Sequence, residues 1–293
     1  MELRVGPSAV PSSSASLPGA WGRIDWSPPV PDHFLIPEHH YRMRGDCSFL
    51  TPGQRVRLNH LAVRFSCESF VHFERYVIDY LEQYPGRLAP LTERRVRRFV
   101  DEERVHVDAF YAVLERLRPE LHAGRQLRMH RWTWVDRLLL RVSPSVTFFL
   151  LAAIFEEMTL YVPVVMDERP EQSYAPLHEV MRLHAREERG HVALDERVLA
   201  HAAQRQPRWL VSLQVVLTLG LLVSVGMQMN RAWKRGVEQF AREEGLRPAQ
   251  ARALLGKRLS TSDEMGLRSI SARLAHSPLG GARLLRAVLD RLT

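Results

Sequence analysis

Two short stretches of the chain repeat one arrangement of acidic residues and histidine. They read EERVHV at 102–107 and EERGHV at 187–192. Each contains a Glu-x-x-His motif, and the residues of the two motifs are Glu103 with His106 and Glu188 with His191. Residues three apart on a helix lie on one face, so each motif can direct a carboxylate and an imidazole at the same metal ions. A single copy arises readily by chance, whereas two copies in a shared repeat predict a metal centre.

The cysteine content limits the kind of metal site. Only Cys47 and Cys67 are present. They form at most one bridge, and they are too few for an iron–sulfur cluster or a four-thiolate zinc site. Any metal must therefore be bound by carboxylates and by some of the 13 histidines.

A two-metal site in a helical bundle needs one more glutamate from each of two other helices. Glu68 lies in an apolar stretch, and Glu156 and Glu157 interrupt the apolar run 148–165. Glu68 is the candidate from the first helix because of its apolar neighbours. We choose Glu157 over Glu156 for spacing, because Glu157 precedes Glu188 by 31 residues and Glu68 precedes Glu103 by 35. A small error in helix boundaries would exchange Glu157 for Glu156, which otherwise has a supporting role.

Helix periodicity places a third histidine beside the second motif. His184 precedes Glu188 by four residues and His191 by seven, so the three share one stripe of two turns. His184 is either a third imidazole ligand or a histidine that bonds a nearby carboxylate, and the residues alone leave these readings about even. Four neighbouring acids could hold the ligating imidazoles through their free N–H groups: Asp101, Glu102, Glu187 and Asp195.

Four helices must position these residues. Apolar residues recur at intervals of three and four over about 54–82, 92–117, 144–167 and 174–205, with proline and glycine between them. Antiparallel pairing of the first two would bring Glu68 and Glu103 to the same height, about 20 Å and about 18 Å from the turn. No cluster of strands is evident, so we predict an all-α fold.

The chain divides into three parts on this interpretation. Residues 1–53, rich in proline and serine, form a tail and an irregular arm; residues 54–240 form the metal-binding helical domain; residues 241–293 form short helices that pack on it. The composition, 45% hydrophobic and 25% charged, excludes a mainly disordered chain. The first residues lack the apolar core of a secretory signal, so we expect a cytoplasmic protein.

Residues 209–229 carry no charge and have the length of a membrane span. They also include polar residues such as Ser212, Gln214 and Thr218. We favour a helix buried against the core by about two to one over a membrane-inserted helix, because hydropathy alone does not separate the two. Membrane association is the less favoured alternative.

Taken in order, the candidate ligands are Glu68, then Glu103 and His106, then Glu157, and finally His184, Glu188 and His191. This order resembles the p-aminobenzoate N-oxygenases, the AurF-like di-iron oxygenases, over roughly residues 50–205. The extra histidine favours that family over ferritins, rubrerythrins and acyl-carrier desaturases. The resemblance implies a ferritin-like four-helix bundle that binds two iron ions, activates dioxygen, and oxidises an amine, in particular an aryl amine, to hydroxylamine, nitroso or nitro products. A manganese–iron pair is an alternative to two irons.

The remaining expectations concern partners. No glycine-rich nucleotide loop is present, so electrons must come from an external donor. The net charge of +8 is dispersed and no reader motif accompanies it, so we expect no nucleic-acid partner. We expect a homodimer. A di-iron hydroxylase or desaturase acting on carbon and a non-catalytic ferritin-like iron-binding protein are the alternative functions.

Overall fold

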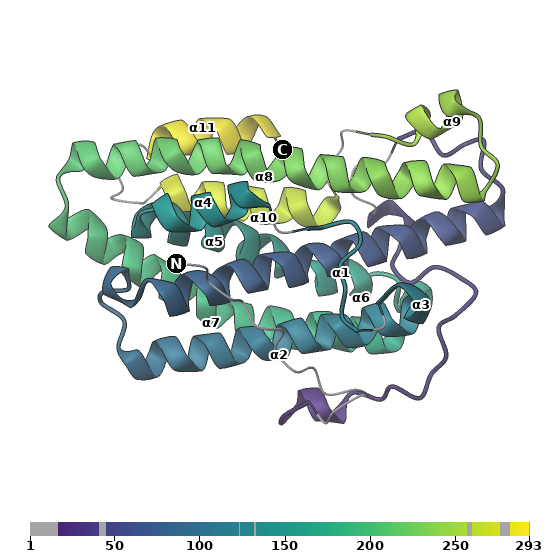
Figure 1. The fold of residues 1–293 in the computed structure, drawn as a ribbon, viewed down its shortest axis with the longest axis horizontal. Helices are drawn as coiled ribbons and strands as arrows, with labels where there is room; N and C mark the ends of the chain where they lie inside the picture. The colour runs from purple at the N-terminus through teal and green to yellow at the C-terminus, as the bar shows by residue number, and fades with distance from the viewer. Residues whose placement is uncertain are drawn as a thin grey trace.

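The computed structural model describes residues 17–40, 45–122, 124–131, 133–256, 260–275 and 282–292, so the first sixteen residues of the predicted tail lie outside the described part. Within those ranges the regular structure is helical and no strand is present, which confirms the all-α prediction (Figure 1). The α-helices are α1 (Pro52–Gln83), α2 (Glu93–Leu117), α3 (Pro119–His122), α4 (Trp134–Val142), α5 (Ser145–Thr159), α6 (Val162–Asp167), α7 (Ala175–Arg205), α8 (Arg208–Glu243), α9 (Pro248–Ala253), α10 (Thr261–Ala275) and α11 (Ala282–Leu292). Short 3-10 helices are η1 (Trp21–Arg23), η2 (Glu38–His40), η3 (Pro85–Arg87) and η4 (Pro170–Gln172).

Four long helices form the centre of the molecule as two neighbouring pairs. α1 packs along α2, α5 packs along α7, and α2 contacts α7 (Figure 1). Local sequence fixes where the first pair begins: the Thr51 side chain accepts a hydrogen bond from the Gln54 backbone in a capping box, and the Thr92 side chain accepts one from the Arg95 backbone at the start of α2. Three of the four helices predicted from the periodicity are therefore found close to their expected bounds.

The third predicted helix is two helices in the structure. α5 ends at Thr159 and α6 begins at Val162, so the segment expected to be one helix over 144–167 is broken. Pro163 lies at the start of α6, where its missing N–H is tolerated; in the middle of a continuous helix it would remove a hydrogen bond and clash with the preceding turn.

Aromatic contacts join the two pairs away from the metal centre. The rings of Tyr80 on α1 and Phe148 on α5 stack with their centroids 3.6 Å apart, and the Tyr80 hydroxyl donates a hydrogen bond to the Ser143 carbonyl at 3.2 Å. At the edge of α5, α10 packs closely: a Cβ on Gly266 would lie only 2.4 Å from the Cα of Met158. These contacts hold α5 in a fixed rotation.

The segment before α1 is irregular and is fastened to α1. The Asn59 amide accepts a hydrogen bond from the Leu35 N–H at 2.7 Å and donates one to the Ile36 carbonyl at 2.8 Å. Leu35, Ile36 and Trp21 are buried. The arm therefore forms part of the core, and its Trp21 contacts His106 on α2 and Glu187 on α7.

α8 is buried on one face only, which differs from the buried helix favoured by its sequence. Only 28% of its most apolar stretch is buried, against 72% for the α5–α6 segment, the other segment apolar and long enough to cross a membrane. Gln214 and Thr218 lie on the inner face, where the Thr147 hydroxyl donates to the Gln214 carbonyl at 3.0 Å. Large apolar side chains on the other face are exposed, because the helices of this chain cover only one side of α8.

Candidate metal centre

The repeated motifs meet in the middle of the four long helices. Two overlapping groups of buried residues offer donor atoms that all lie within 4.8 Å of one another. One group is Glu74, His106, His184 and Glu188; the other is Glu103, His106, Glu188 and His191. The residues come from α1, α2 and α7, and the two groups share His106 and Glu188. The structure therefore brings together five of the seven predicted ligands and adds Glu74.

Glu188 is the centre of this arrangement. Its Oε1 lies 3.1 Å from both His106 Nδ1 and His184 Nε2, and its Oε2 lies 3.4 Å from His191 Nδ1. Donor atoms about 2.1 Å from one metal ion at right angles are about 3 Å apart, so these spacings match those of ligands around metal ions. The two oxygens of Glu188 thus lie beside different imidazoles, Oε1 beside His106 and His184 and Oε2 beside His191.

Each remaining carboxylate lies beside one or two of the imidazoles. Glu74 Oε1 is 3.0 Å from His184 Nε2. Glu103 Oε2 is 3.0 Å from His106 Nδ1, and Glu103 Oε1 is 3.2 Å from His191 Nδ1. His184 therefore directs its Nε2 at the cluster, in the group that contains Glu74. His106 and His191 direct their Nδ1 at it. Both sequence readings of His184 fit this geometry: its Nε2 bonds the Glu74 carboxylate, and it also belongs to a group of residues that could hold a metal ion.

The outer nitrogens of two histidines are held by acids from the opposite helix. His106 Nε2 lies 3.1 Å from Glu187 Oε2, and His191 Nε2 lies 3.1 Å from Glu102 Oε2. Donation from Nε2–H leaves the Nδ1 lone pair for a metal ion and fixes the ring orientation. This confirms the prediction that Glu102 and Glu187 orient the imidazoles.

The other two acids predicted to hold an imidazole, Asp101 and Asp195, have different partners. Asp101 is exposed on α2 and pairs with Arg104 at 3.2 Å. Asp195 is buried near Glu156 on α5, and each of its oxygens is buried without a hydrogen bond of good geometry in the described part of the chain. Asp195 therefore faces a carboxyl group rather than an imidazole N–H.

Glu68, predicted as the first ligand, lies outside the cluster. Its Oε2 accepts hydrogen bonds from the backbone N–H groups of Arg128, Met129 and His130 at 3.1, 2.6 and 3.2 Å. Glu74 lies six residues further along α1, about 9 Å away and on a different face. α1 ends at Gln83, nine residues after Glu74, and α2 begins at Glu93, ten residues before Glu103. Glu74 and Glu103 therefore lie at nearly the same distance from the turn that joins the two helices. The expectation of Glu68 rested on its apolar neighbours and on helix ends near Leu81 and Leu91, whereas the observed ends at Gln83 and Glu93 move the matching position to Glu74.

Glu157, predicted as the ligand from the third helix, faces α10. Its carboxylate accepts a hydrogen bond from the Ser269 hydroxyl and lies 3.4 Å from Arg273 Nε. Consecutive helical residues point about 100° apart, so only one member of the Glu156–Glu157 pair can face the cluster. Glu156 is that residue: it is buried, and it interacts electrostatically with Glu188, His191 and Glu103.

The arm contributes a side chain that sequence reasoning missed. The Trp21 Nε1–H donates to Glu187 Oε1 at 3.2 Å, and its ring centroid lies 5.4 Å from that of His106. Trp21 thus supports the acid that orients His106. No spacing signal in the sequence connects Trp21 to residue 187, since the contact joins residues 166 positions apart.

Burial and the charges of neighbouring groups shift the pKa values of the carboxyl groups in the cluster. Burial and the nearby Glu103 and Glu188 raise the pKa of Glu74 well above its usual range, and burial and Asp195 do the same for Glu156. Against burial, His191 and other neighbours lower the pKa of Glu103 to about 2. Against burial, His184 and His191 also lower the pKa of Glu188 well below its usual range, so two carboxyl groups favour the proton and two favour the charge.

The pKa values of the three histidines are also shifted in different directions. Burial opposes the charge of His106 and His191, but their carboxylate neighbours raise both pKa values well above the usual range. Burial lowers the pKa of His184, and Glu188 offsets this only in part. A buried set of this kind is costly without cations to neutralise it.

The charge balance fits a pair of divalent cations. Five buried carboxyl groups lie here. Burial raises the pKa of Asp195 well above its usual range, and the other four, Glu74, Glu103, Glu156 and Glu188, carry four negative charges when ionised. Two divalent ions would neutralise them and leave the three histidines uncharged. Both oxygens of Glu188 and of Glu156 are buried without a well-directed hydrogen bond within the described residues. These buried His and Glu residues can hold metal ions.

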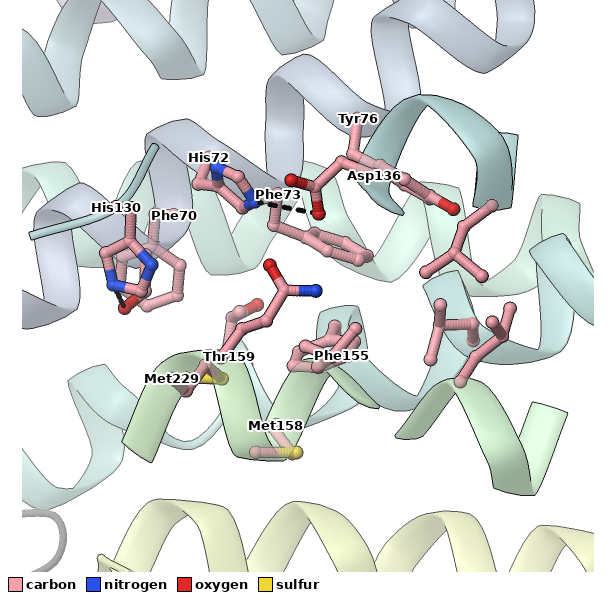
Figure 2. A pocket seen from close by; sticks show the side chains of 16 residues that line it. Phe70, His72, Phe73, Tyr76, His130, Asp136, Phe155, Met158, Thr159 and Met229 are labelled. Atoms are coloured by element: carbon pink, nitrogen blue, oxygen red, sulfur yellow. Dashed lines mark hydrogen bonds and ion pairs between the residues drawn. The ribbon is translucent and has the colours of Figure 1, made fainter. Parts of the chain in front are cut away.

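An apolar cavity lies beside the cluster, between α1, α4, α5 and α8 (Figure 2). Its lining includes Phe73 and Phe155, whose centroids are 4.6 Å apart and which directly precede Glu74 and Glu156 in sequence. Phe70 also lines the cavity, 5.5 Å from His184 between ring centroids. Aromatic rings therefore separate the cavity from the buried ligands.

The cavity has one polar region. Figure 2 shows His72 and Asp136 directed toward each other, and the ring centroid of His130 lies 5.5 Å from that of His72. His130 Nε2 lies 2.9 Å from the Ser69 hydroxyl, which itself donates to the Phe65 carbonyl at 2.7 Å, so the His130 Nε2–H is the donor. Mostly apolar walls with a few polar groups are typical of sites for small organic molecules.

No protein-family model, no curated protein and no solved structure matches this chain.

Proposed function

We propose that this protein is a di-iron oxygenase that uses dioxygen to oxidise an amine nitrogen. The observation that carries the proposal is the pair of four-residue groups that share Glu188 and His106. Two adjacent metal positions within one buried cluster, with oxygen and nitrogen donors alone, are what a dinuclear site in a ferritin-like helical bundle requires. α1, α2, α5 and α7 would be the four helices of that bundle.

Iron is the proposed metal because imidazole and carboxylate donors suit it and because two divalent ions balance four carboxylates. A manganese–iron pair fits the same donors. Bound iron would supply the electrons that activate dioxygen. The ligands would be Glu74, Glu103, His106, Glu156, His184, Glu188 and His191, which preserve the order of residue types that resembles the p-aminobenzoate N-oxygenases.

The protein's own residues would prepare the centre for that chemistry. Glu102 and Glu187 fix the rings of His191 and His106, and Glu188 faces both metal positions. Phe70, Phe73 and Phe155 exclude water from the side that faces the cavity. Burial and the nearby Glu188 and Glu103 raise the pKa of Asp195, which lies beside Glu156, well above its usual range.

The substrate is proposed from the family resemblance and from the cavity. An aryl amine would place its ring among the phenylalanines, with the amine toward the ligands. Oxidation to the hydroxylamine consumes one dioxygen, two electrons and two protons and releases one water. The electrons would come from an external donor, and we expect a cytoplasmic homodimer without a nucleic-acid partner.

The test is reconstitution of the protein with ferrous iron, reduction without oxygen, and exposure to isotopically labelled dioxygen in the presence of an aryl-amine panel. We expect about two irons per chain and labelled oxygen on the amine nitrogen. Labelled oxygen on carbon, or a new double bond, would instead identify a hydroxylase or desaturase. Iron binding without any product would indicate a storage or binding role.

A matched pair of variants links the product to the cluster. Glu188→Gln replaces the residue that both groups share, whereas Glu196→Gln changes an exposed glutamate two turns further along α7. Loss of iron and product in the first variant alone would support the assignment. Normal turnover by Glu188→Gln would contradict it.

A further inference from the structure

Large apolar side chains are exposed in one region of the molecule. The described part of the chain contains ten exposed large hydrophobic side chains, and nine of them belong to α4 and α8. These nine, which we call the α4–α8 face, are Trp134, Leu138, Val142, Trp209, Leu213, Val216, Leu217, Val223 and Met227. Trp134 and Trp209 are each 69% exposed. An apolar patch of this extent on a folded chain indicates an interaction surface.

The part on α8 forms one continuous stripe. At 100° per residue, its six exposed apolar side chains fall within an arc of about 120°, and from Trp209 to Met227 the stripe is about 27 Å long. The opposite side of the helix is packed in the fold, with Val211, Val215 and Thr218 buried. A helix with one packed and one apolar exposed side suits a flat apolar medium along its length, and it cannot be surrounded by lipid as a membrane span is.

Cations mark both ends of this stripe. Arg205 and Arg208 precede it, and Arg231 and Lys234 continue it on the same side of α8. Residues 205–237 contain no acidic residue. On α4, Arg137 and Arg141 are exposed and the one acid is buried. An apolar surface bordered by cations is complementary to a bilayer with anionic headgroups.

The same charges disfavour a second copy of the chain as the occupant. Two α8 stripes packed antiparallel about their centres would bring Arg205 and Arg208 of one copy close to residues 231 and 234 of the other. All four positions are basic. Like charges at both ends of such an interface would repel, whereas anionic lipid would pair with all of them.

We propose that the α4–α8 face docks this protein on an anionic membrane surface, with α8 lying in the plane of the interface. α4 and α8 lie next to each other and together line the apolar cavity beside the metal cluster (Figure 1). A lipid-soluble substrate could therefore enter the cavity from the bilayer. That consequence rests on the proposed function, whereas the docking itself does not.

Sedimentation with vesicles tests the docking. The full-length protein is mixed with phosphatidylcholine vesicles that contain either no anionic lipid or about one third phosphatidylglycerol, at low and at high salt. We expect binding to the anionic vesicles, weakened by salt, with a blue shift of tryptophan emission as Trp134 and Trp209 leave water. Binding should be the same with and without iron, so its outcome is separate from that of the oxygenase proposal.

Two double variants, each with a single-substitution control, test whether the α4–α8 face is the surface that binds the vesicles. The double variant Trp209→Gln with Val223→Gln removes apolar area from the stripe. Val164→Gln removes the exposed large apolar side chain that, among the residues the structure describes, lies outside the α4–α8 face. Arg208→Glu with Arg231→Glu reverses charge at both ends, and Arg197→Glu reverses an exposed arginine on α7. We expect about a tenfold loss of vesicle binding in each double variant and none in the single controls.

Three results would overturn the proposal. The first is no binding to either kind of vesicle. The second is a dimer in solution that the Trp209→Gln, Val223→Gln variant converts to a monomer, because a second copy would then cover the face. The third is protein in bacterial membranes that resists extraction by high salt and alkali and is released only by detergent, because α8 would then span the bilayer.

Discussion

His191 on α7 bonds Glu102 on α2 at 3.1 Å, and the equivalent pair, His106 with Glu187, crosses between the same helices in the opposite direction at 3.1 Å. The repeated Glu-Glu-x-x-His pattern thus supplies in each copy one acid that faces the cluster and one that holds the histidine of the other copy. The outer acids therefore hold two of the histidines that could bind a metal ion.

Replacing either outer acid should weaken metal binding without loss of fold. Glu102→Gln and Glu187→Gln keep the size of the side chain but accept the imidazole N–H less strongly, so we expect metal affinity to fall about 10- to 100-fold. Competition with a chromogenic chelator measures this. Asp101→Asn, one residue before Glu102 and exposed, is the control and should bind as wild type. Equal affinities in all four proteins would contradict the role of the outer acids.

The choice between neighbouring glutamates can be tested by metal content. Glu74→Gln and Glu156→Gln should each reduce the bound metal below two ions per chain, because each removes a buried carboxylate of the cluster. Glu68→Gln and Glu157→Gln are matched controls on the same helices and should retain two. Elemental analysis of the reconstituted proteins measures the metal bound per chain. Loss of metal in Glu68→Gln and Glu157→Gln alone would show that the ligands are those expected from the sequence.

Acid sensitivity of folding should depend on His130. Burial, together with His72 and Arg235, lowers the pKa of His130 to about 3. An unfolded histidine takes up a proton below about pH 6.5. The contribution of His130 to stability is therefore complete above pH 6.5, and it is lost as the pH falls from 6.5 toward 3, by about 1.4 kcal/mol per pH unit.

The variant His130→Gln keeps a donor for the Ser69 hydroxyl and removes the titrating group. Urea unfolding between pH 4.5 and 7 should show a smaller loss of unfolding free energy with acid in this variant than in the wild type. An unchanged slope would show that His130 titrates normally in the folded protein.

Helix packing beside the metal centre should be sensitive at Gly266. A Cβ there would meet the backbone of α5 at Met158 and Glu157, at 2.4 to 3.0 Å, so Gly266→Ala must push α10 away from α5. We expect a loss of about 1–3 kcal/mol in unfolding free energy. Gly226 on α8 has no atom within 4 Å of its Cβ position, and Gly226→Ala should add about 0.5–1 kcal/mol. Thermal unfolding compares the two, and equal effects would contradict the packing argument.

Removal of metal should destabilise the whole cluster. Four carboxylates are buried at its centre, and bound cations stabilise the folded state in proportion to their affinity. We expect a chelator to lower the Tm and ferrous or manganous ions to raise it in the wild type. In Glu188→Gln the same ions should have little effect, and an undiminished rise in Tm would place the metal elsewhere.

Interactions within single helices could be predicted from the sequence. The Thr51 and Thr92 caps, the starts of the long helices and both Glu-x-x-His pairs depend on residues three or four apart, and the helix repeat alone places those on one face. His184 shares that stripe, so its position in the cluster follows from the same rule. For the same reason, composition and periodicity were sufficient for the all-α fold.

Only the tertiary structure decided which glutamates of α1 and α5 join the cluster. Glu74 faces the cluster because the turn at 84–92 sets how far α1 is shifted along its axis relative to α2. Glu156 faces it because contact with α10 sets the rotation of α5 about its axis. A shift along the axis or a rotation of 100° would place a different glutamate at the cluster. The contact of Trp21 with Glu187 and the exposure of one side of α8 are also long-range outcomes. Both depend on which surfaces meet across the folded chain, and helix periodicity contains no information about that.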